Sequence, residues 1–418
     1  MSRLLIDGGK RLSGSVDIGG AKNSVLPILA ATLLIKGVSV IKNCPRLSDV
    51  EVATRILTYL GCVCKREEDA VIVDARYVGC DRIPDELMRE MRSSVMFLGP
   101  ILARCKSAVI SNPGGCELGP RPIDLHLKAL RDLGYDIDDK NGYIICSKSK
   151  RQAKSRVHLA FPSVGATENV ILATVLGGSR TVITGAAKEP EIVDLIDFLT
   201  SAGAKIYGGG TDTIEIIGVE ELDSAEHSVI PDRIVAATYI SAAAVTLGEV
   251  ELRRMNPSHL TAVINAFCEM GVSLRCYEDS IVVKAEQRPR AIPLTKTLVY
   301  PGFPTDAGPL LVSALCLSKG CSVFVETIFE NRFRYIDELI RFGADIRLQN
   351  KVAVIEGVEK LVGASVNSTD LRGGAAMVVA ALGAEGKSEI NDIYHIERGY
   401  EDISRDLKIL GANIKRED

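Results

Sequence analysis

The chain repeats one pattern six times. In each repeat, a helix-like segment ends in Gly and is followed by residues typical of a β-hairpin. The spacings between successive glycines are 73, 69, 68, 72 and 68 residues, and the glycines are Gly61, Gly134, Gly203, Gly271, Gly343 and Gly411. A spacing of about 70 residues is longer than a solenoid repeat and fits a supersecondary unit. The sequence therefore predicts a fold built by repetition.

Each repeat contains the same elements in the same order. An apolar helix comes first, then a short strand, an amphipathic helix closed by Gly, and two more strands. The first helices are apolar nearly all round, which is typical of helices buried on every side. Their predicted spans are 24–35, 93–104, 167–176, 234–246, 307–317 and 374–383. We predict an α/β (α+β) fold with buried helices in the middle of each domain and hairpins outside.

The chain length and the sixth repeat predict the domain organisation. A chain of 418 residues exceeds the size of a single core, so six repeats divide into two domains of three. The sixth repeat stops at ANIKRED before its last strand, whereas residues 3–17 are strand-like and precede the first buried helix. We expect this N-terminal segment to supply the missing strand. The predicted domains are 21–230 and 1–20 plus 231–418, with crossovers near Gly20 and Pro231.

Composition excludes several classes of function. Lys plus Arg total 50 against 54 for Asp plus Glu, without a long run of either sign, so we expect neither nucleic-acid binding nor a polybasic membrane patch. The N-terminus lacks a signal-peptide pattern, and no run of about 18 apolar residues occurs, which predicts a soluble cytoplasmic protein. Among 11 cysteines only Cys62 and Cys64 are closely spaced, without a second pair or nearby histidines, so we expect no metal site and no disulfide framework.

The predicted buried helices begin with polar residues. N-capping accounts for the short polar side chains, which are Asn23, Ser93, Thr305 and Asp370. It does not account for the cations, which are Lys22, Arg92, Arg233 and Arg372. Cations oppose the positive end of the helix dipole, whereas helix N-termini and basic side chains together form phosphate and carboxylate sites. The pattern therefore favours binding of an anion at these helix starts.

A loop rich in Gly and Pro interrupts the second repeat. Residues 112–124 hold three glycines and three prolines, which is typical of a lid over a binding site. Cys116 lies in this loop, and a cation, Arg121, follows five residues later. We expect an exposed thiol here, which leaves a catalytic cysteine and an ordinary exposed cysteine as alternatives.

At these residues the chain resembles the UDP-N-acetylglucosamine 1-carboxyvinyltransferase family of enolpyruvyl transferases. The matching segments occur along essentially the whole chain and include GGAKNSVLPILAATLL, PGGCELGPRPIDLHLKAL, FPSVGATEN, YPGFPTDAGP, IFENRFRYIDELIRFGA, DLRGGAAMVVAALGAEG and IYHIERGYED. The resemblance implies two inside-out α/β barrel domains of the EPSP synthase-like kind, each with three βαβαββ-type repeats around buried helices. It also implies an active site in the cleft between them, with no metal and no cofactor.

The resemblance implies a role for each matching residue. Lys22, Arg121 and Arg398 would hold phosphoenolpyruvate, while Arg92 and Arg372 add positive charge. Cys116 would protonate the methylene carbon or form a covalent adduct, and Asp306 would take the proton of the sugar 3-hydroxyl. The residues implied to hold the UDP-sugar are Asn23, Arg121, Pro122, Ile123, Asp124, Leu125, Ser163, Val164, Gly165, Asp306 and Phe329. Asp370 and Leu371 are implied as further substrate-binding residues.

The activity implied by the resemblance is transfer of the enolpyruvyl group from phosphoenolpyruvate to UDP-N-acetylglucosamine, with release of phosphate. This is the first committed step of peptidoglycan precursor synthesis, and so serves cell-wall biogenesis, cell shape and cell division. The family is the target of fosfomycin. We expect a monomer whose partners are its two small-molecule substrates.

Two alternatives and a few departures accompany this interpretation. The alternatives are 5-enolpyruvylshikimate-3-phosphate synthase, which lacks the cysteine loop, and a catalytically silent homologue that binds a UDP-sugar. After Asp306 many family members continue with Met-Gln, whereas this chain has Ala307-Gly308-Pro309, which removes a polar side chain beside the expected base. Glu117 and Pro120 occupy positions where the family varies.

Overall fold

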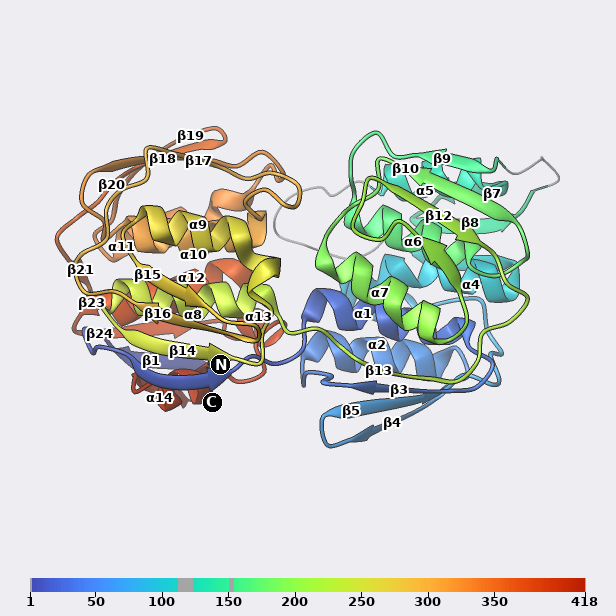
Figure 1. The fold of residues 1–418 in the computed structure, drawn as a ribbon, viewed down its shortest axis with the longest axis horizontal. Coiled ribbons are helices and arrows are strands. Elements are labelled where there is room, and N and C mark those ends of the chain that lie inside the picture. Colours follow the sequence, from blue (N-terminus) through green and yellow to red (C-terminus); the bar gives the residue numbers. More distant parts are fainter. Residues whose placement is uncertain (1, 112–122, 150–153, 418) are drawn as a thin grey trace. The chain divides into compact units, whose positions relative to one another are not determined.

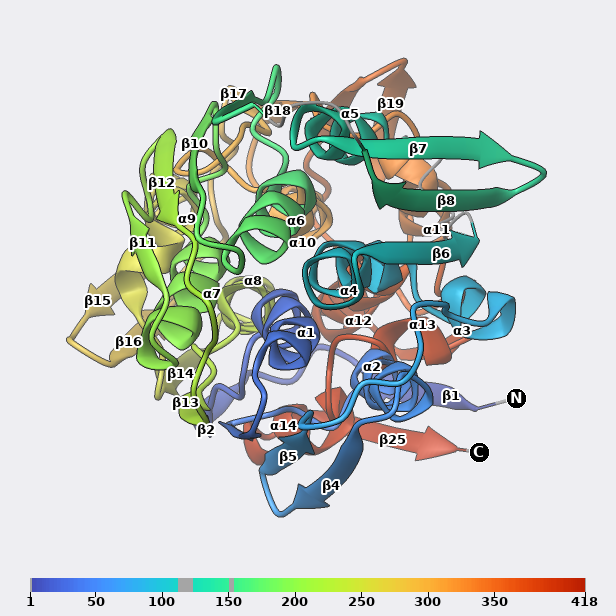
Figure 2. The same ribbon diagram turned by 90° about the vertical axis from the view of Figure 1, so that its right-hand side faces the viewer.

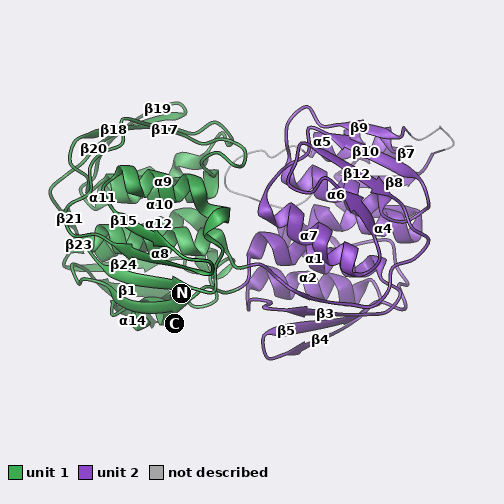
Figure 3. Ribbon diagram, in the orientation of Figure 1, with its two compact units in different colours: residues 1–19, 117–120, 231–418 green, residues 20–116, 121–230 purple. Residues whose placement is uncertain are grey.

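The computed structural model describes residues 2–111, 123–149 and 154–417, which form two compact units (Figure 3). Unit 1 contains residues 2–19 and 231–417. Unit 2 contains the described residues between 20 and 230. None of the helices in the described part of the chain is long and apolar enough to cross a bilayer.

The six apolar helices are confirmed, three in each unit. In unit 2 they are α1 (Lys22–Ala31), continued by the 3₁₀ helix η1 (Thr32–Leu34), then η2 (Arg92–Phe97) with α4 (Leu98–Cys105), and α6 (Val164–Thr174). In unit 1 they are α8 (Arg233–Val245), η4 (Thr305–Ala307) with α10 (Gly308–Leu315), and α12 (Leu371–Gly383). Each begins one to three residues before its predicted start. In five of the six the added residues include polar side chains that an apolar pattern does not reveal, whereas in α6 they are Val164, Gly165 and Ala166.

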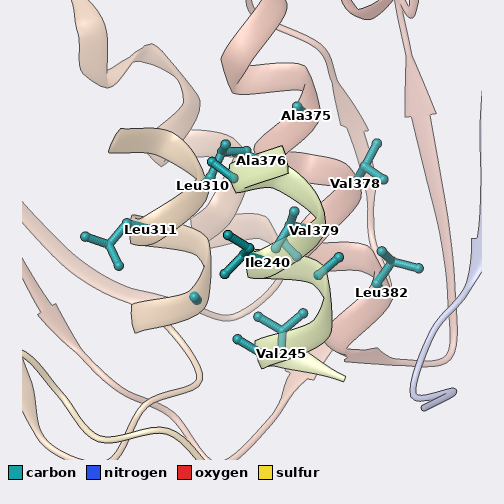
Figure 4. Packing of buried hydrophobic residues seen from close by; sticks show 14 of the residues in the cluster. Ile240, Val245, Leu310, Leu311, Ala375, Ala376, Val378, Val379 and Leu382 are labelled. Atoms are coloured by element: carbon teal, nitrogen blue, oxygen red, sulfur yellow. The ribbon is translucent and has the colours of Figure 1, made fainter. Parts of the chain in front are cut away.

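Packing among these helices explains why they are apolar all round. In unit 1, α8, α10 and α12 pack against one another through fully buried side chains such as Ile240, Leu310 and Val379 (Figure 4). Buried serines join the same helices, since Ser241 Oγ donates to Leu310 O at 2.7 Å and Ser313 Oγ donates to Ala376 O at 2.9 Å. Helices in such a centre have no face left for solvent.

The second helix of each repeat ends at the repeated glycine. These helices are α2 (Ser48–Tyr59), α5 (Asp124–Asp132), α7 (Pro190–Ser201), α9 (Thr261–Glu269), α11 (Ile336–Arg341) and α14 (Ile403–Ile409). All six repeated glycines have positive φ, between 82° at Gly134 and 107° at Gly61. A left-handed residue after the helix is the usual Gly-terminated C-cap, so the glycine repeat has a backbone cause.

Small sheets lie outside the buried helices in both units (Figures 1 and 2). The sheets of unit 2 are β13 (Ala225–Ser228), β3 (Val38–Lys42), β5 (Ala70–Asp74) and β4 (Val63–Glu67); β6 (Ser107–Ser111), β8 (Tyr143–Lys148) and β7 (Tyr135–Lys140); and β11 (Lys205–Tyr207), β12 (Thr213–Ile217), β10 (Arg180–Thr184) and β9 (Arg156–His158). The four-stranded sheets of unit 1 are β15 (Ser273–Cys276), β16 (Ser280–Lys284), β14 (Glu249–Arg253) and β2 (Ser13–Asp17); β17 (Leu294–Lys296), β18 (Cys321–Val325), β20 (Val352–Glu356) and β19 (Asp345–Gln349); and β22 (Ser365–Asn367), β24 (Lys387–Asn391), β1 (Arg3–Asp7) and β25 (Asn413–Glu417). A further pair in unit 1 joins β21 (Leu361–Val362) to β23 (Ala384–Glu385).

The N-terminal strand completes the sixth repeat, as predicted. β1 lies between β24 and β25 and pairs antiparallel with both, with Leu4 opposite Ile390 and Ile6 opposite Ile414. β2 takes a different place and pairs in parallel with β14, while β13 pairs in parallel with β3. Thus the strand before α1 belongs to unit 1, and the strand before α8 belongs to unit 2.

The two chain crossovers run beside each other. Ala21 N donates to Ile230 O and Asp232 N donates to Gly19 O, each at 2.8 Å. A Cβ atom at Gly20 would lie 1.9 Å from Asn43 O, so this position requires glycine. These contacts fix the backbone immediately before α1 and α8, where the polar helix starts begin.

Candidate active site

The capping prediction for the helix starts is correct at one position and wrong at three. Asp370 caps α12, because its carboxylate accepts from Arg372 N at 3.0 Å and Gly373 N at 3.1 Å. Asn23, Ser93 and Thr305 lie inside the first turn of their helices and do not occupy the cap position. The residues at those cap positions are Ala21, Met91 and Pro304. The early helix starts leave these polar side chains available for other contacts.

In unit 2, Lys22 is held by a carboxylate from a neighbouring helix. Its Nζ lies 2.7 Å from Asp49 Oδ2, in the first turn of α2, and the two side chains are only 9% and 3% exposed. The adjacent Asn23 is exposed. The Asp49 carboxylate therefore neutralises part of the positive charge of Lys22, for which the sequence predicted a bound anion. Sequence reasoning missed Asp49 because an acidic residue at a helix start is ordinary.

A buried histidine lies beside the start of α6. His126 Nδ1 is 2.8 Å from Asn169 Nδ2, and Asn169 also accepts from Gly99 N at 2.7 Å. Burial lowers the pKa of His126 to about 4, and the positive charge of Arg92 acts in the same direction. The imidazole is therefore neutral at pH 7. Nothing in the sequence pattern singled out His126 or Asn169.

The predicted contact residues around this histidine are only partly described. Ser163 caps α6 by accepting from Ala166 N at 3.3 Å, and Val164 is the first residue of that helix. A Cβ atom at Gly165 would lie 3.0 Å from His126 Cε1, so glycine leaves room for the ring. The segment Ile123, Asp124 and Leu125 forms the start of α5, with Asp124 exposed. Cys116, Arg121 and Pro122 lie outside the described residues, as do Glu117 and Pro120.

In unit 1, Asp306 lies between two buried arginines. Arg332 Nη2 is 3.1 Å from Asp306 Oδ1, and Arg372 Nε is 3.5 Å from Asp306 Oδ2. Both arginine side chains are 2% exposed, whereas that of Asp306 is 29% exposed. Arg332 Nη1 also lies 3.9 Å from Asp370 Oδ1. The two arginines thus fix the orientation of the Asp306 carboxylate, and the exposed part of this side chain stays open to a ligand.

The charge on Arg372 is maintained by its surroundings. Burial opposes the charge, but Tyr400, Asp306 and Asp232 together raise the pKa of Arg372 above its ordinary value. Arg372 Nη1 donates to Tyr400 OH at 3.4 Å, and that hydroxyl is 2.7 Å from Thr238 Oγ1. Arg372 therefore remains a fixed cation at the start of α12.

The remaining predicted residues of unit 1 are Phe329, Leu371 and Arg398. Phe329 is half-buried, and the guanidinium carbon of Arg332 lies 5.8 Å from its ring centroid. Leu371 is the first residue of α12, and Arg398 directly follows α13 (Tyr394–Glu397). Sequence reasoning missed Arg332, which begins η5 (Arg332–Tyr335) rather than one of the buried helices.

Gly308, in the Ala307-Gly308-Pro309 segment, packs closely against the ring of Phe324. A Cβ atom at Gly308 would lie 2.9 Å from Phe324 Cζ, while Ala307 and Pro309 are buried. A side chain at position 308 would therefore meet the Phe324 ring. In this chain, glycine accommodates that ring, and Pro309 is compatible with the first turn of α10, where no intrahelical N–H bond is needed.

Comparison with known proteins gives full-length matches. A family model described as EPSP synthase (3-phosphoshikimate 1-carboxyvinyltransferase) matches residues 6–407. A protein named UDP-N-acetylglucosamine 1-carboxyvinyltransferase 2, from Caldanaerobacter subterraneus subsp. tengcongensis, is 52% identical over 416 residues, which are 100% of both chains. The protein named UDP-N-acetylglucosamine 1-carboxyvinyltransferase 1 from Staphylococcus aureus is 43% identical over 419 residues, covering 100% of this chain and 99% of its own.

Solved structures show the same fold. The enolpyruvyl transferase NikO from Streptomyces tendae matches with a TM-score of 0.88 at 23% identity, over 99% of this chain and 98% of its own. EPSP synthase from Acinetobacter baumannii matches with a TM-score of 0.75 at 18% identity, over 100% of both chains. The fold prediction of two α/β domains built from repeats around buried helices is thereby confirmed.

The low pKa of His126 gives a prediction for pH titration. Because this pKa lies below the value of about 6.5 for an unfolded histidine, the folded state binds fewer protons. The resulting stabilisation is complete above about pH 6.5 and is lost as the pH falls toward 4. We expect the ¹³Cε1 resonance of His126, assigned with His126→Gln, to titrate near pH 4, with exposed His158 as reference in the same spectra. A midpoint above about pH 6 would show that the imidazole is not desolvated.

Proposed function

The chain belongs to the EPSP synthase family and, within it, to the UDP-N-acetylglucosamine 1-carboxyvinyltransferases, and we propose that it performs their reaction. It transfers the enolpyruvyl group of phosphoenolpyruvate to the 3-hydroxyl of UDP-N-acetylglucosamine and releases phosphate. Full-length identity of 52% to a protein of that name carries this conclusion. The reaction supplies peptidoglycan precursors.

The reaction requires an acid, a base and fixed positive charge. The sugar hydroxyl attacks carbon 2 of phosphoenolpyruvate, which becomes electrophilic only when its methylene carbon is protonated. A tetrahedral intermediate forms, then the methyl group loses a proton and phosphate leaves, restoring the enol ether. Buried cations stabilise the anionic intermediate and the leaving phosphate.

Asp306 is the proposed base for the sugar hydroxyl. Its two carboxylate oxygens are held by Arg332 and Arg372, and the side chain is still partly exposed. This geometry supports a carboxylate that keeps one orientation before substrate arrives, which is the requirement for efficient proton transfer. Arg372 also places a permanent positive charge beside the reacting groups.

The proposed acid and phosphate ligands follow from the matching segments. Cys116 delivers the proton or forms a covalent adduct, while Lys22, Arg121 and Arg398 bind the phosphate and carboxylate of phosphoenolpyruvate. Arg92 contributes further positive charge. The burial of Lys22 beside Asp49 supports a lysine held in one orientation, which favours its role as a phosphate ligand.

The proposed UDP-sugar ligands are the residues implied by the matching segments. Those described in unit 2 are Asn23, Ile123, Asp124, Leu125, Ser163, Val164 and Gly165. Arg121 and Pro122 complete the proposed set and lie outside the described residues. Those in unit 1 are Asp306 and Phe329, and we propose Asp370 and Leu371 as further substrate-binding residues. One chain supplies both sets, which supports action as a monomer. Both substrates are water-soluble phosphorylated metabolites, which supports a cytoplasmic location.

Phosphate release provides the test of the reaction. We expect release from phosphoenolpyruvate only when UDP-N-acetylglucosamine is present, because the sugar hydroxyl is the attacking group. Binding of the sugar nucleotide without phosphate release would indicate a silent homologue. Release with shikimate 3-phosphate in place of the sugar nucleotide would indicate an EPSP synthase.

Alkylation by fosfomycin tests Cys116. We expect one covalent adduct, located at Cys116 by peptide mass spectrometry, and slower labelling when phosphoenolpyruvate is present. Cys268, Cys276 and Cys321 are exposed thiols in the described part of the chain and serve as internal controls. Labelling of these cysteines at the same rate, or an adduct that persists in Cys116→Ser, would contradict the assignment. Cys116→Asp is expected to escape alkylation, since no thiol remains.

A further inference from the structure

One buried carboxylate in unit 1 has no part in the site described so far. Glu326 directly follows β18 and is 1% exposed. Its Oε1 accepts from Thr297 Oγ1 at 2.9 Å, Ile328 N at 2.7 Å and Phe329 N at 3.1 Å. Its Oε2 accepts from Thr305 Oγ1 at 2.8 Å. Four donors therefore satisfy this carboxylate, as a buried charge requires.

These bonds join three separate segments of the chain. Thr297 follows β17, Phe329 lies in the segment after β18, and Thr305 begins η4. Bonds to the backbone two and three residues ahead would suffice for a local turn. The bonds to Thr297 and Thr305 reach 29 and 21 residues along the sequence, so Glu326 does more than cap its own turn.

Thr305 is the neighbour of the proposed base. Its hydroxyl is held by Glu326, and its carbonyl accepts from Arg332 Nη2 at 3.1 Å. The same Nη2 lies 3.1 Å from Asp306 Oδ1. Glu326 thus holds the Thr305 side chain, while Arg332 holds both the Thr305 carbonyl and the Asp306 carboxylate.

We propose that Glu326 is a positioning residue that fixes the Asp306 carboxylate and the Phe329 backbone in one geometry. This inference rests on the proposed function, in which Asp306 takes the sugar proton and Phe329 contacts the UDP-sugar. Loss of the hydrogen bond between Thr305 and Glu326 releases only the helix start that carries Asp306. Loss of the whole Glu326 side chain releases both this helix start and the backbone of Phe329.

Thr305→Val separates these two effects, because valine keeps the shape of threonine and removes its hydroxyl. We expect kcat to fall by about fivefold, the equivalent of one hydrogen bond, while the KM for UDP-N-acetylglucosamine stays within about twofold of wild type. Thr246→Val is the matched control, since the Thr246 hydroxyl is also buried and donates to Ala242 O, at 2.7 Å. That control is expected to keep both constants.

Glu326→Gln and Glu326→Ala complete the experiment. We expect Glu326→Ala to lower kcat and to raise the KM for UDP-N-acetylglucosamine. Glutamine keeps the volume and one acceptor oxygen, so Glu326→Gln is expected to bring both constants most of the way back to wild type. If Glu326→Ala does not fold, Thr305→Val and Glu326→Gln still decide the matter. A kcat of Thr305→Val equal to wild type, or a KM that rises as much as kcat falls, would overturn the inference. A wild-type protein without sugar-dependent phosphate release would instead contradict the proposed function, and the inference with it.

Discussion

A helix that is apolar on every side must be covered on every side, and the architecture of both units follows from this constraint. A single repeat has one such helix, one amphipathic helix and a few short strands, which cannot enclose the apolar helix. Three repeats can, as in unit 1, where α8, α10 and α12 each pack on the other two and the sheets lie outside. In unit 1 the side chains between α8, α10 and α12 are almost completely buried. The exchange of β2 and β13 between the repeats completes the outer layer.

The same packing concentrates polar groups at the helix starts. Backbone N–H groups in a first helical turn have no partner within the helix, so these ends are suited to bind anions and side-chain oxygens. Here the cations form ion pairs with carboxylates of the same unit. Lys22 pairs with Asp49 in unit 2, and Arg332 and Arg372 pair with Asp306 in unit 1. Such pairs keep buried charges in fixed orientations, which is costly for stability and useful for catalysis.

The parts of the fold that depend on local backbone chemistry were predictable from the sequence. The six glycines mark left-handed helix ends, and the incomplete last hairpin indicated that β1 would complete it. The helix starts were placed slightly too late, and three expected caps were wrong, because polar residues of a first turn and a cap position look alike in sequence.

The partners of the predicted site residues could not be read from the sequence in the same way. Asp49, Arg332 and Glu326 are 27, 26 and 21 residues away from Lys22, Asp306 and Thr305, and no spacing rule connects them. His126 likewise depends on Asn169 from another repeat. A single sequence shows which side chains carry chemistry, whereas their orientation depends on tertiary contacts.

Amide hydrogen exchange with and without UDP-N-acetylglucosamine tests most directly whether the polar helix starts bind the sugar nucleotide. First-turn amides lack helical partners and exchange readily until a ligand covers them. Binding of the sugar nucleotide at these helix starts should slow exchange at the starts of α6 and η4 and in the segment around Phe329, and leave the outer strands β4, β5, β19 and β20 unchanged. Unchanged exchange at those starts, or protection confined to the outer strands, would contradict it.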